Sequence, residues 1–164
     1  MKHIELYENF DPWGDRFPRE MDEMTKRWLD ECTRGSWRLN DETGLVDIQG
    51  SFNCDDQDLE NLKVRFGTVS DHFNCDNNQL TSLEGGPRHV GRDFTCARNR
   101  LKTLAGAPET VGGLFDCQVN LLTNLEGAPK SVGGDFFCRH NKLTSTDGKP
   151  RSIGGKFLCD SNMM

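Results

Sequence analysis

The chain has 164 residues, a formal net charge of −6 and 34% hydrophobic residues, which suits one domain with a thin core. Most of the excess acid lies in residues 1–50, which carry 7 basic and 12 acidic groups, whereas residues 51–164 carry 13 and 14. The nearly neutral second part has neither the basic stripe of a nonspecific nucleic-acid binder nor the dense acid of a DNA mimic, so a nucleic-acid partner is not expected.

The chain begins with polar and charged residues. The first ten, MKHIELYENF, lack the apolar core of a secretory signal, and no stretch approaches the ~18 apolar residues of a membrane span. We therefore expect a cytoplasmic protein without a membrane partner. Residues 1–15 are interpreted as a lead-in whose Phe10 and Trp13 pack on the segment that follows.

A helix is predicted over about residues 18–34, with Gly35 as a stop signal. Its apolar residues share one face: Met21, Met24, Trp28, Leu29 and Cys32. Apolar and polar residues then alternate on both sides of a predicted turn at residues 41–44, which indicates a hairpin or an irregular coil over about residues 37–50. Residues 1–50 are interpreted as an N-terminal cap, because a solenoid must cover its apolar end; a separate functional domain is the alternative.

A repeat of 21 residues runs from residue 51 to residue 164, which gives six coils. Cysteine marks the period, at Cys54, Cys75, Cys96, Cys117, Cys138 and Cys159. Phenylalanine lies two residues before each cysteine, and from the second coil onward asparagine lies three residues after it. Columns of Leu, Gly, Pro and Val or Ile keep the same period. This regularity predicts a repeat solenoid.

Each unit reads F-x-C-x-x-N-x-L-x-x-L-x-G-x-P-x-x-V-G-G-x. Phe and Cys alternate with polar residues, which predicts a short strand with one buried face. The Asn amide is expected to bond backbone groups of its own and the next coil, and Gly and Pro to set the corners. Stacked coils would place the strands in a parallel sheet on the concave face, with an irregular convex side.

These columns resemble the leucine-rich repeat, whose consensus is L-x-x-L-x-L-x-x-N/C-x-L, with Phe and Cys at strand leucine positions and Asn at the ladder position. The short unit, with N-x-L-T-x-L followed by Pro, is similar to the repeats of bacterial effector proteins. The longer motif C-x-x-N-x-L-T-S-L-E-G-x-P resembles repeat proteins of tailed bacteriophages. The resemblance covers residues 51–164 and implies a fold rather than an activity.

Both ends of the repeat region depart from the pattern. The first coil has Gln57 in place of Asn, and Val64-Arg65-Phe66 in place of Gly-x-Pro, as expected beside a cap. After the sixth strand the sequence has only Asn162, Met163 and Met164 beyond the repeat's turn. The last coil is therefore expected to be uncapped, and either to fray or to pair with a second copy in a homodimer.

The chemistry-bearing residues do not predict an active site. The repeat cysteines form one column, which favours buried thiols over a metal site or disulfides, since in-register strands hold Cβ atoms about 4.8 Å apart and a disulfide prefers about 3.5–4.5 Å. The histidines, His3, His72, His89 and His140, share no column, and V-G-G lacks the G-K-[ST] of a phosphate loop. We find no nucleophile–base pair, and expect no enzyme, no metal site and no cofactor.

The candidate binding surface is the outward side of the strands. Side chains that flank Phe and Cys are mostly polar, but the later repeats add apolar residues and Arg, which are common at protein-binding hot spots. The predicted partner-binding residues are Leu114, Val119, Phe137, Arg139, His140, Leu158 and Arg98. The alternative is that Leu114 and Leu158 pack on neighbours or on a dimer mate. A second candidate surface is a basic cluster, which keeps nucleic-acid binding as the weaker alternative although its residues are predicted to be spread over different faces of one coil: Arg88, Arg92, Arg98, Arg100 and Lys102.

Together these features predict a non-catalytic module that binds another protein. With the bacteriophage resemblance, the hypothesis becomes a phage factor that engages a host protein in the host cytoplasm. The alternative is a structural component that self-assembles through its last coil.

Overall fold

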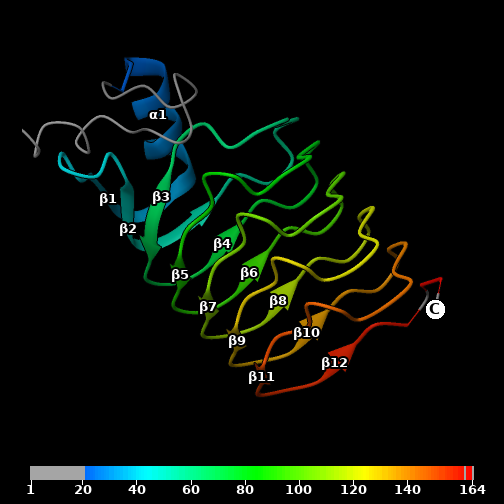
Figure 1. The fold of residues 1–164 in the computed structure, drawn as a ribbon. Helices are drawn as coiled ribbons and strands as arrows, with labels where there is room; N and C mark the ends of the chain where they lie inside the picture. Colours follow the sequence, from blue (N-terminus) through cyan, green and yellow to red (C-terminus); the bar gives the residue numbers. More distant parts are fainter. Residues whose placement is uncertain (1–20, 161, 164) are drawn as a thin grey trace, which may run out of the picture.

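The 21-residue period becomes one turn of a parallel β-solenoid in the computed structural model, which describes residues 21–160, 162 and 163 (Figure 1). The coils stack in one row, with the helix at one end and the last strand at the other. Equivalent residues of neighbouring coils pair in register, as Phe73 does with Phe94 and Phe94 with Phe115. The predicted repeat solenoid with a helical cap is confirmed.

The cap begins with helix α1 (Glu23–Cys32). Its N-cap is Asp22, whose carboxylate accepts a hydrogen bond from the Thr25 N–H at 2.7 Å. Trp28, Leu29 and Cys32 are buried, but Met24 is 84% exposed, so its predicted place on the buried face is wrong. With about 100° of rotation per residue, Met24 lies about 140° from Leu29, beyond the margin of the face that packs on the first coil.

The chain leaves α1 directly into a β-hairpin. Strand β1 (Thr33–Leu39) pairs antiparallel with β2 (Val46–Asn53), so the segment predicted as a hairpin or an irregular coil is a hairpin. Gly35 does not stop the helix, as the sequence suggested, but lies in β1 opposite Gly50. A Cβ on Gly35 would meet the Gln49 oxygen at 2.0 Å, so the two strands cross too closely for a side chain.

The predicted cap boundaries change in two ways. The helix predicted for about residues 18–34 is shorter at both ends: it begins at Glu23 after the extended N-cap Asp22, and it ends at Cys32 because Thr33 and Arg34 already pair with β2. The boundary predicted at residue 50 falls inside β2, so the cap and the solenoid share a strand. The expected lead-in of residues 1–15 lies outside the described residues.

Each coil after the cap contributes two short strands. Strand β2 starts both ladders, because it pairs with β4 through Phe52 and with β3 through Val46 and Ile48. The Phe ladder continues through β4 (Phe73–Asn74), β6 (Phe94–Thr95), β8 (Phe115–Asp116), β10 (Phe136–Phe137) and β12 (Phe157–Leu158). The Val ladder continues through β3 (Phe66–Val69), β5 (His89–Val90), β7 (Thr110–Val111), β9 (Ser131–Val132) and β11 (Ser152–Ile153). Figure 1 shows the two ladders as two parallel rows of arrows.

The Val ladder is a feature that the expectation of one strand per coil did not include. The V-G-G segments form the corner between the two ladders, as predicted, but their glycines serve close approach rather than positive φ. A Cβ on the first glycine of this pair would meet a backbone oxygen of the preceding coil at 2.1 Å, at Gly91, Gly112, Gly133 and Gly154. The glycines of G-x-P do take positive φ, from 85° at Gly148 to 90° at Gly106.

Stacked aromatic rings and thiols fill the core between the ladders. From Phe73 to Phe157, neighbouring ring centroids are 5.1–5.6 Å apart. The predicted column of buried, free thiols is confirmed from Cys54 to Cys138, while Cys159 in the last coil is half-buried. Burial raises the pKa of the Cys75, Cys96 and Cys117 thiols well above the ordinary value, so they remain protonated and unreactive at neutral pH.

Buried asparagines join each coil to its neighbours, as the sequence predicted. The Asn120 Nδ2 donates to the carbonyl oxygens of Cys96 and Cys117 at 3.0 and 3.2 Å, and its Oδ1 accepts from the Leu101 N–H at 3.0 Å. The same pattern recurs at Asn78, Asn99 and Asn141. In the first coil, Gln57 turns instead toward the cap, where its Oε1 accepts from the Trp28 indole N–H at 2.7 Å.

Candidate functional site

The predicted partner-binding residues lie on the outward side of the Phe ladder and on the turns that follow it. Phe137 in β10 pairs in register with Leu158 in β12, and both side chains are half-buried. Leu114, just before β8, is also half-buried, and its N–H donates to the Asp93 carboxylate at 2.8 Å. These three side chains therefore offer only part of their apolar surface.

The structure brings Arg98, Val119 and His140 together as one row, which we call the left-handed row. They take the same position in three consecutive coils, and the Val119 N–H donates to the Arg139 oxygen of the next coil at 3.0 Å. All three are exposed, with φ of 55°, 54° and 53°. Positive φ costs a non-glycine residue about 1–2 kcal/mol, and it is least tolerable for a β-branched residue such as valine.

Sequence reasoning missed this backbone conformation, although a signal was present. The two preceding coils carry Asp56 and Asn77 at the same position, with φ of 53° and 52°. Asp and Asn tolerate the left-handed conformation because their short polar side chains bond locally. The later coils keep the conformation but replace these residues with Arg98, Val119 and His140. The conformation thus belongs to the repeat's turn, and what needs a reason is the choice of residues that tolerate it poorly; such strained residues are typical of functional positions.

Arg139 has a partner within the chain. Its guanidinium forms an ion pair with Asp160 of the next coil. A backbone hydrogen bond and the Arg139 hydrogen bond lower the pKa of the Asp160 carboxyl. Arg139 therefore contributes less free charge to the candidate surface than the sequence suggested.

The predicted basic group divides into two parts. Arg98, Arg100 and Lys102 are exposed while Asn99 and Leu101 between them are buried, so the three cations lie on the solvent-facing edge of the turn that follows β6. The other two lie elsewhere: Arg92 pairs with Asp71 at 2.9 Å, and Arg88 lines a separate groove. The expected spread over different faces is therefore correct only for Arg88 and Arg92.

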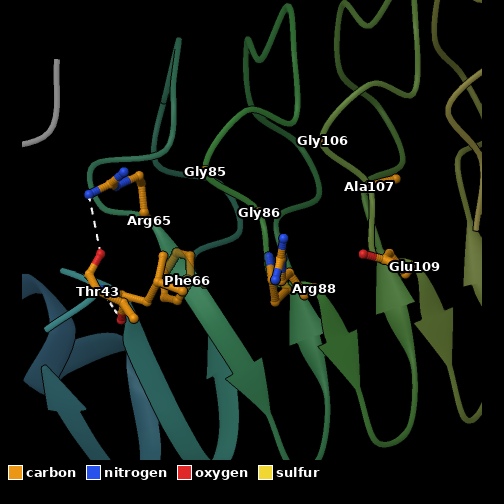
Figure 2. A pocket seen from close by; sticks show the side chains of 11 residues that line it. Thr43, Arg65, Phe66, Gly85, Gly86, Arg88, Gly106, Ala107 and Glu109 are labelled. Atoms are coloured by element: carbon orange, nitrogen blue, oxygen red, sulfur yellow. Dashed lines mark hydrogen bonds between the residues drawn. The ribbon is translucent and has the colours of Figure 1, made fainter. Parts of the chain in front are cut away.

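The groove that contains Arg88 lies between the hairpin turn and the G-x-P corners (Figure 2). Its volume of about 440 Å³ is in the range of small-ligand sites. The first coil creates it, because Phe66 packs on Phe52 with ring centroids 4.8 Å apart and Arg65 beside it reaches the Thr43 carbonyl at 3.4 Å. Glu109 on the far side is paired with Lys130. The lining can hold a polar ligand, but it contains no histidine or cysteine that could act as base or nucleophile.

Asp76 is a half-buried carboxyl on the outward side of the Phe ladder. Burial raises the pKa of Asp76 to about 6, and the negative charge of Asp116 adds to the rise. The hydrogen bond from the Ala97 N–H lowers the pKa, but by less than burial raises it. Because the folded state binds this proton more tightly than the unfolded state, the contribution of Asp76 to stability is fully present below the unfolded pKa of 3.8 and is lost as pH rises through about 6.

Asp76→Asn is therefore expected to raise the free energy of unfolding at about pH 7.5 by about 1–2 kcal/mol, and to flatten its pH dependence between about pH 4 and pH 6.5. The asparagine oxygen can still accept from the Ala97 N–H. Urea unfolding at pH 4, pH 6.5 and pH 7.5 measures both effects. Asp58→Asn, which removes the same charge from an exposed position, is the control. A pH dependence unchanged from wild type would contradict the assignment.

Comparison with models of protein families, with curated proteins and with solved structures finds no match for this chain. Within the part of the chain that the structure describes, no three His, Cys, Asp or Glu side chains are placed to hold a metal ion. In the same residues, no helix combines the length and the apolar character needed to span a lipid bilayer. Among the surface features described, the left-handed row is the one whose positive φ costs stability without an evident structural reason for the residues that adopt it.

Proposed function

We propose that this solenoid is a non-catalytic protein-binding module that uses the left-handed row. The observation that carries the proposal is the combination of strain and exposure: Val119 has φ of 54° and is 43% exposed. A valine there costs stability and is only partly buried in return. Contact with a partner explains why the later coils keep side chains other than Asn or Asp at this position.

Neighbouring residues support a protein as the partner. Phe137 and Leu158 present half-buried apolar surface on the adjoining strands, and Arg98 adds a guanidinium, a combination common at hot spots of protein interfaces. The stacked coils hold these groups on a rigid scaffold, which lowers the entropic cost of binding. The resemblance of the repeat to leucine-rich repeats and to bacteriophage repeat proteins extends the proposal to a phage factor that engages a host protein in the host cytoplasm.

Val119→Asn tests the proposal, because it is expected to affect stability and binding in opposite directions. Asparagine accepts positive φ, so the free energy of unfolding should rise by about 0.5–1 kcal/mol. Loss of the apolar contact should reduce capture of the partner in a pull-down from bacterial lysate. Urea unfolding and quantitative mass spectrometry of the eluates measure the two effects.

Ser152→Asn, an exposed change on the Val ladder, is the control for the pull-down. A partner that wild type and both variants retain equally would remove the left-handed row from the binding surface. If Val119→Asn has a lower free energy of unfolding than wild type, Val119 is not strained.

Self-assembly through the last coil is the second candidate, and one observation favours it. Ile153, Phe157 and Cys159 are only half-buried, whereas Val132, Phe136 and Cys138 one coil earlier are at most 1% exposed. Strands β11 and β12 are also the two ends of the strand order, so each leaves one edge unpaired within the described residues. Light scattering over a concentration series separates the candidates, since a strict monomer at high concentration would eliminate this one.

A further inference from the structure

Three cations lie along one edge of the third coil without a partner in the described chain. Arg98, Arg100 and Lys102 are exposed, and none of them forms an ion pair with any residue among 21–160, 162 and 163. By contrast, Arg92 and Lys130 each have a carboxylate partner at 2.9 and 2.8 Å. The three cations therefore keep their charge available to a ligand.

The fold does not require charge on this edge. The first coil has acidic residues at the corresponding positions, the second has neutral ones, and only the third has three cations. In chain order these sets are Asp56, Asp58 and Glu60; Asn77, Gln79 and Thr81; and Arg98, Arg100 and Lys102. Because the second coil builds the same turn with neutral residues, the cations are not needed for packing, and their role lies outside the chain.

An apolar row lies directly beside the cations. The fourth coil places Val119 and Leu121 at two of the same positions, and the fifth coil places His140 and Lys142 there. Coils in register are about 4.8 Å apart. The cations of the third coil, the apolar residues of the fourth and Lys142 of the fifth therefore lie within about 10 Å along the solenoid. We call these residues the turn edge: Arg98, Arg100, Lys102, Val119, Leu121 and Lys142.

We infer that the turn edge binds an acidic, amphipathic protein segment, an inference that rests on the proposed protein-binding function. Carboxylates would meet Arg98, Arg100 and Lys102, while apolar side chains of the same segment cover Val119 and Leu121. A helix suits this spacing, because its residues three and four apart are about 5–6 Å from each other, close to the distance between coils.

A nucleic acid fits the turn edge less well than an acidic protein segment. Single strands are bound by cations together with aromatic side chains that stack on the bases, and the turn edge contains no phenylalanine, tyrosine or tryptophan. The apolar row of Val119 and Leu121 offers nothing to a phosphate backbone.

The test uses a variant whose new side chains already occur at these positions. Arg98→Asn, Arg100→Gln and Lys102→Thr together copy the second coil into the third, so the triple variant is expected to fold. The control triple variant, Arg38→Gln, Arg151→Gln and Lys156→Gln, removes three exposed cations from other surfaces. Fluorescence anisotropy then measures binding of a labelled peptide of Glu-Glu-Leu-Leu repeats, with Glu-Glu-Gln-Gln repeats and single-stranded DNA as comparison probes.

Wild type and the control variant are expected to bind the Glu-Glu-Leu-Leu peptide, and the second-coil copy about tenfold more weakly, with all affinities falling as salt is added. The Glu-Glu-Gln-Gln peptide should bind more weakly than the Glu-Glu-Leu-Leu peptide. Equal affinity of all three proteins, no binding by wild type, or tighter binding of DNA than of the peptide would each overturn the inference.

The inference and the proposed function can fail separately. If Val119→Asn loses the lysate partner but the second-coil copy retains it, protein binding stands and the acidic partner chemistry falls. If both variants retain the partner, the proposed function and the inferred acidic partner are both wrong.

Discussion

Asn120→Ala is expected to lower the free energy of unfolding by about 3–4 kcal/mol. Asn120 is 5% exposed, and its amide joins its own coil to the preceding one: Nδ2 donates to the Cys96 and Cys117 carbonyls, and Oδ1 accepts from the Leu101 N–H at 3.0 Å. The two carbonyls keep a second asparagine donor, but the Leu101 N–H, which lies in the core, loses its acceptor. The lost bonds and this buried, unpaired donor together give the estimate.

Urea unfolding measures the effect, and Asn124→Ala is the matched control. Asn124 is half-buried on the same coil, and its Oδ1 accepts a single exposed bond from the Glu126 N–H at 3.0 Å. Its loss should cost less than about 1 kcal/mol. Similar losses in the two variants would show that the asparagine ladder does not join the coils in the way the hydrogen bonds indicate.

Gly133→Ala is expected to cost about 3 kcal/mol or more, although an exposed residue normally tolerates a methyl group within about 0.5 kcal/mol. The new Cβ would lie 2.1 Å from the Gly112 oxygen and 2.9 Å from its carbonyl carbon. Both atoms belong to the backbone of the adjacent coil, so they cannot move aside without opening the corner between the Phe and Val ladders. The melting temperature and the urea midpoint should both fall.

Gly134→Ala, one residue later, separates this clash from a general effect on the corner. Its Cβ would come no closer than 2.9 Å to the backbone of the preceding coil, and the earlier coils carry Asp71 and Arg92 at the same position. We expect a cost of about 1 kcal/mol. If Gly133→Ala lowers the free energy of unfolding no more than Gly134→Ala does, the coils do not approach each other as closely at the first glycine as the structure indicates.

Asn120→Ala and Gly133→Ala both act on the contacts between neighbouring coils, which are the unit of stability in a solenoid. Each coil touches only its neighbours, so a weakened interface cannot be compensated by distant contacts. A loss of about 3 kcal/mol at one interface is a large part of the 5–15 kcal/mol that holds a typical domain. We therefore expect the coils on the C-terminal side of Asn120 or Gly133 to lose hydrogen-exchange protection first, because the cap stabilises the other end.

Individual elements show where local sequence patterns were sufficient and where they failed. The six cysteines and phenylalanines predicted the Phe ladder correctly, because a column that recurs every 21 residues can be satisfied only by stacking. The Val ladder was missed because each later coil marks it with a single apolar residue, Val or Ile, whereas alternating Phe and Cys mark the other ladder. Gly35 was misread as a helix stop, since only the pairing with Gly50 gives it another role.

The candidate site divides in the same way. Its residues were predicted as outward-facing from their offset to Phe and Cys, and the structure places Phe137, Leu158 and the left-handed row on the surface accordingly. The partner of Arg139 was not predicted, because Asp160 lies 21 residues away and ion pairing depends on side-chain direction. The strain at Val119 was not predicted either, because valine by itself favours negative φ.

The sequence by itself determined the period, the in-register stacking, the buried thiol and asparagine columns and the need for an N-terminal cap, because each follows from repetition at a constant spacing. Only the tertiary structure decided that each coil has a second strand, that the first glycine of each corner faces a backbone oxygen, and that Arg98, Arg100 and Lys102 share one edge. The physical reason is that backbone φ, close approach and side-chain direction are set by contacts with the neighbouring coil, which lies 21 residues away along the chain.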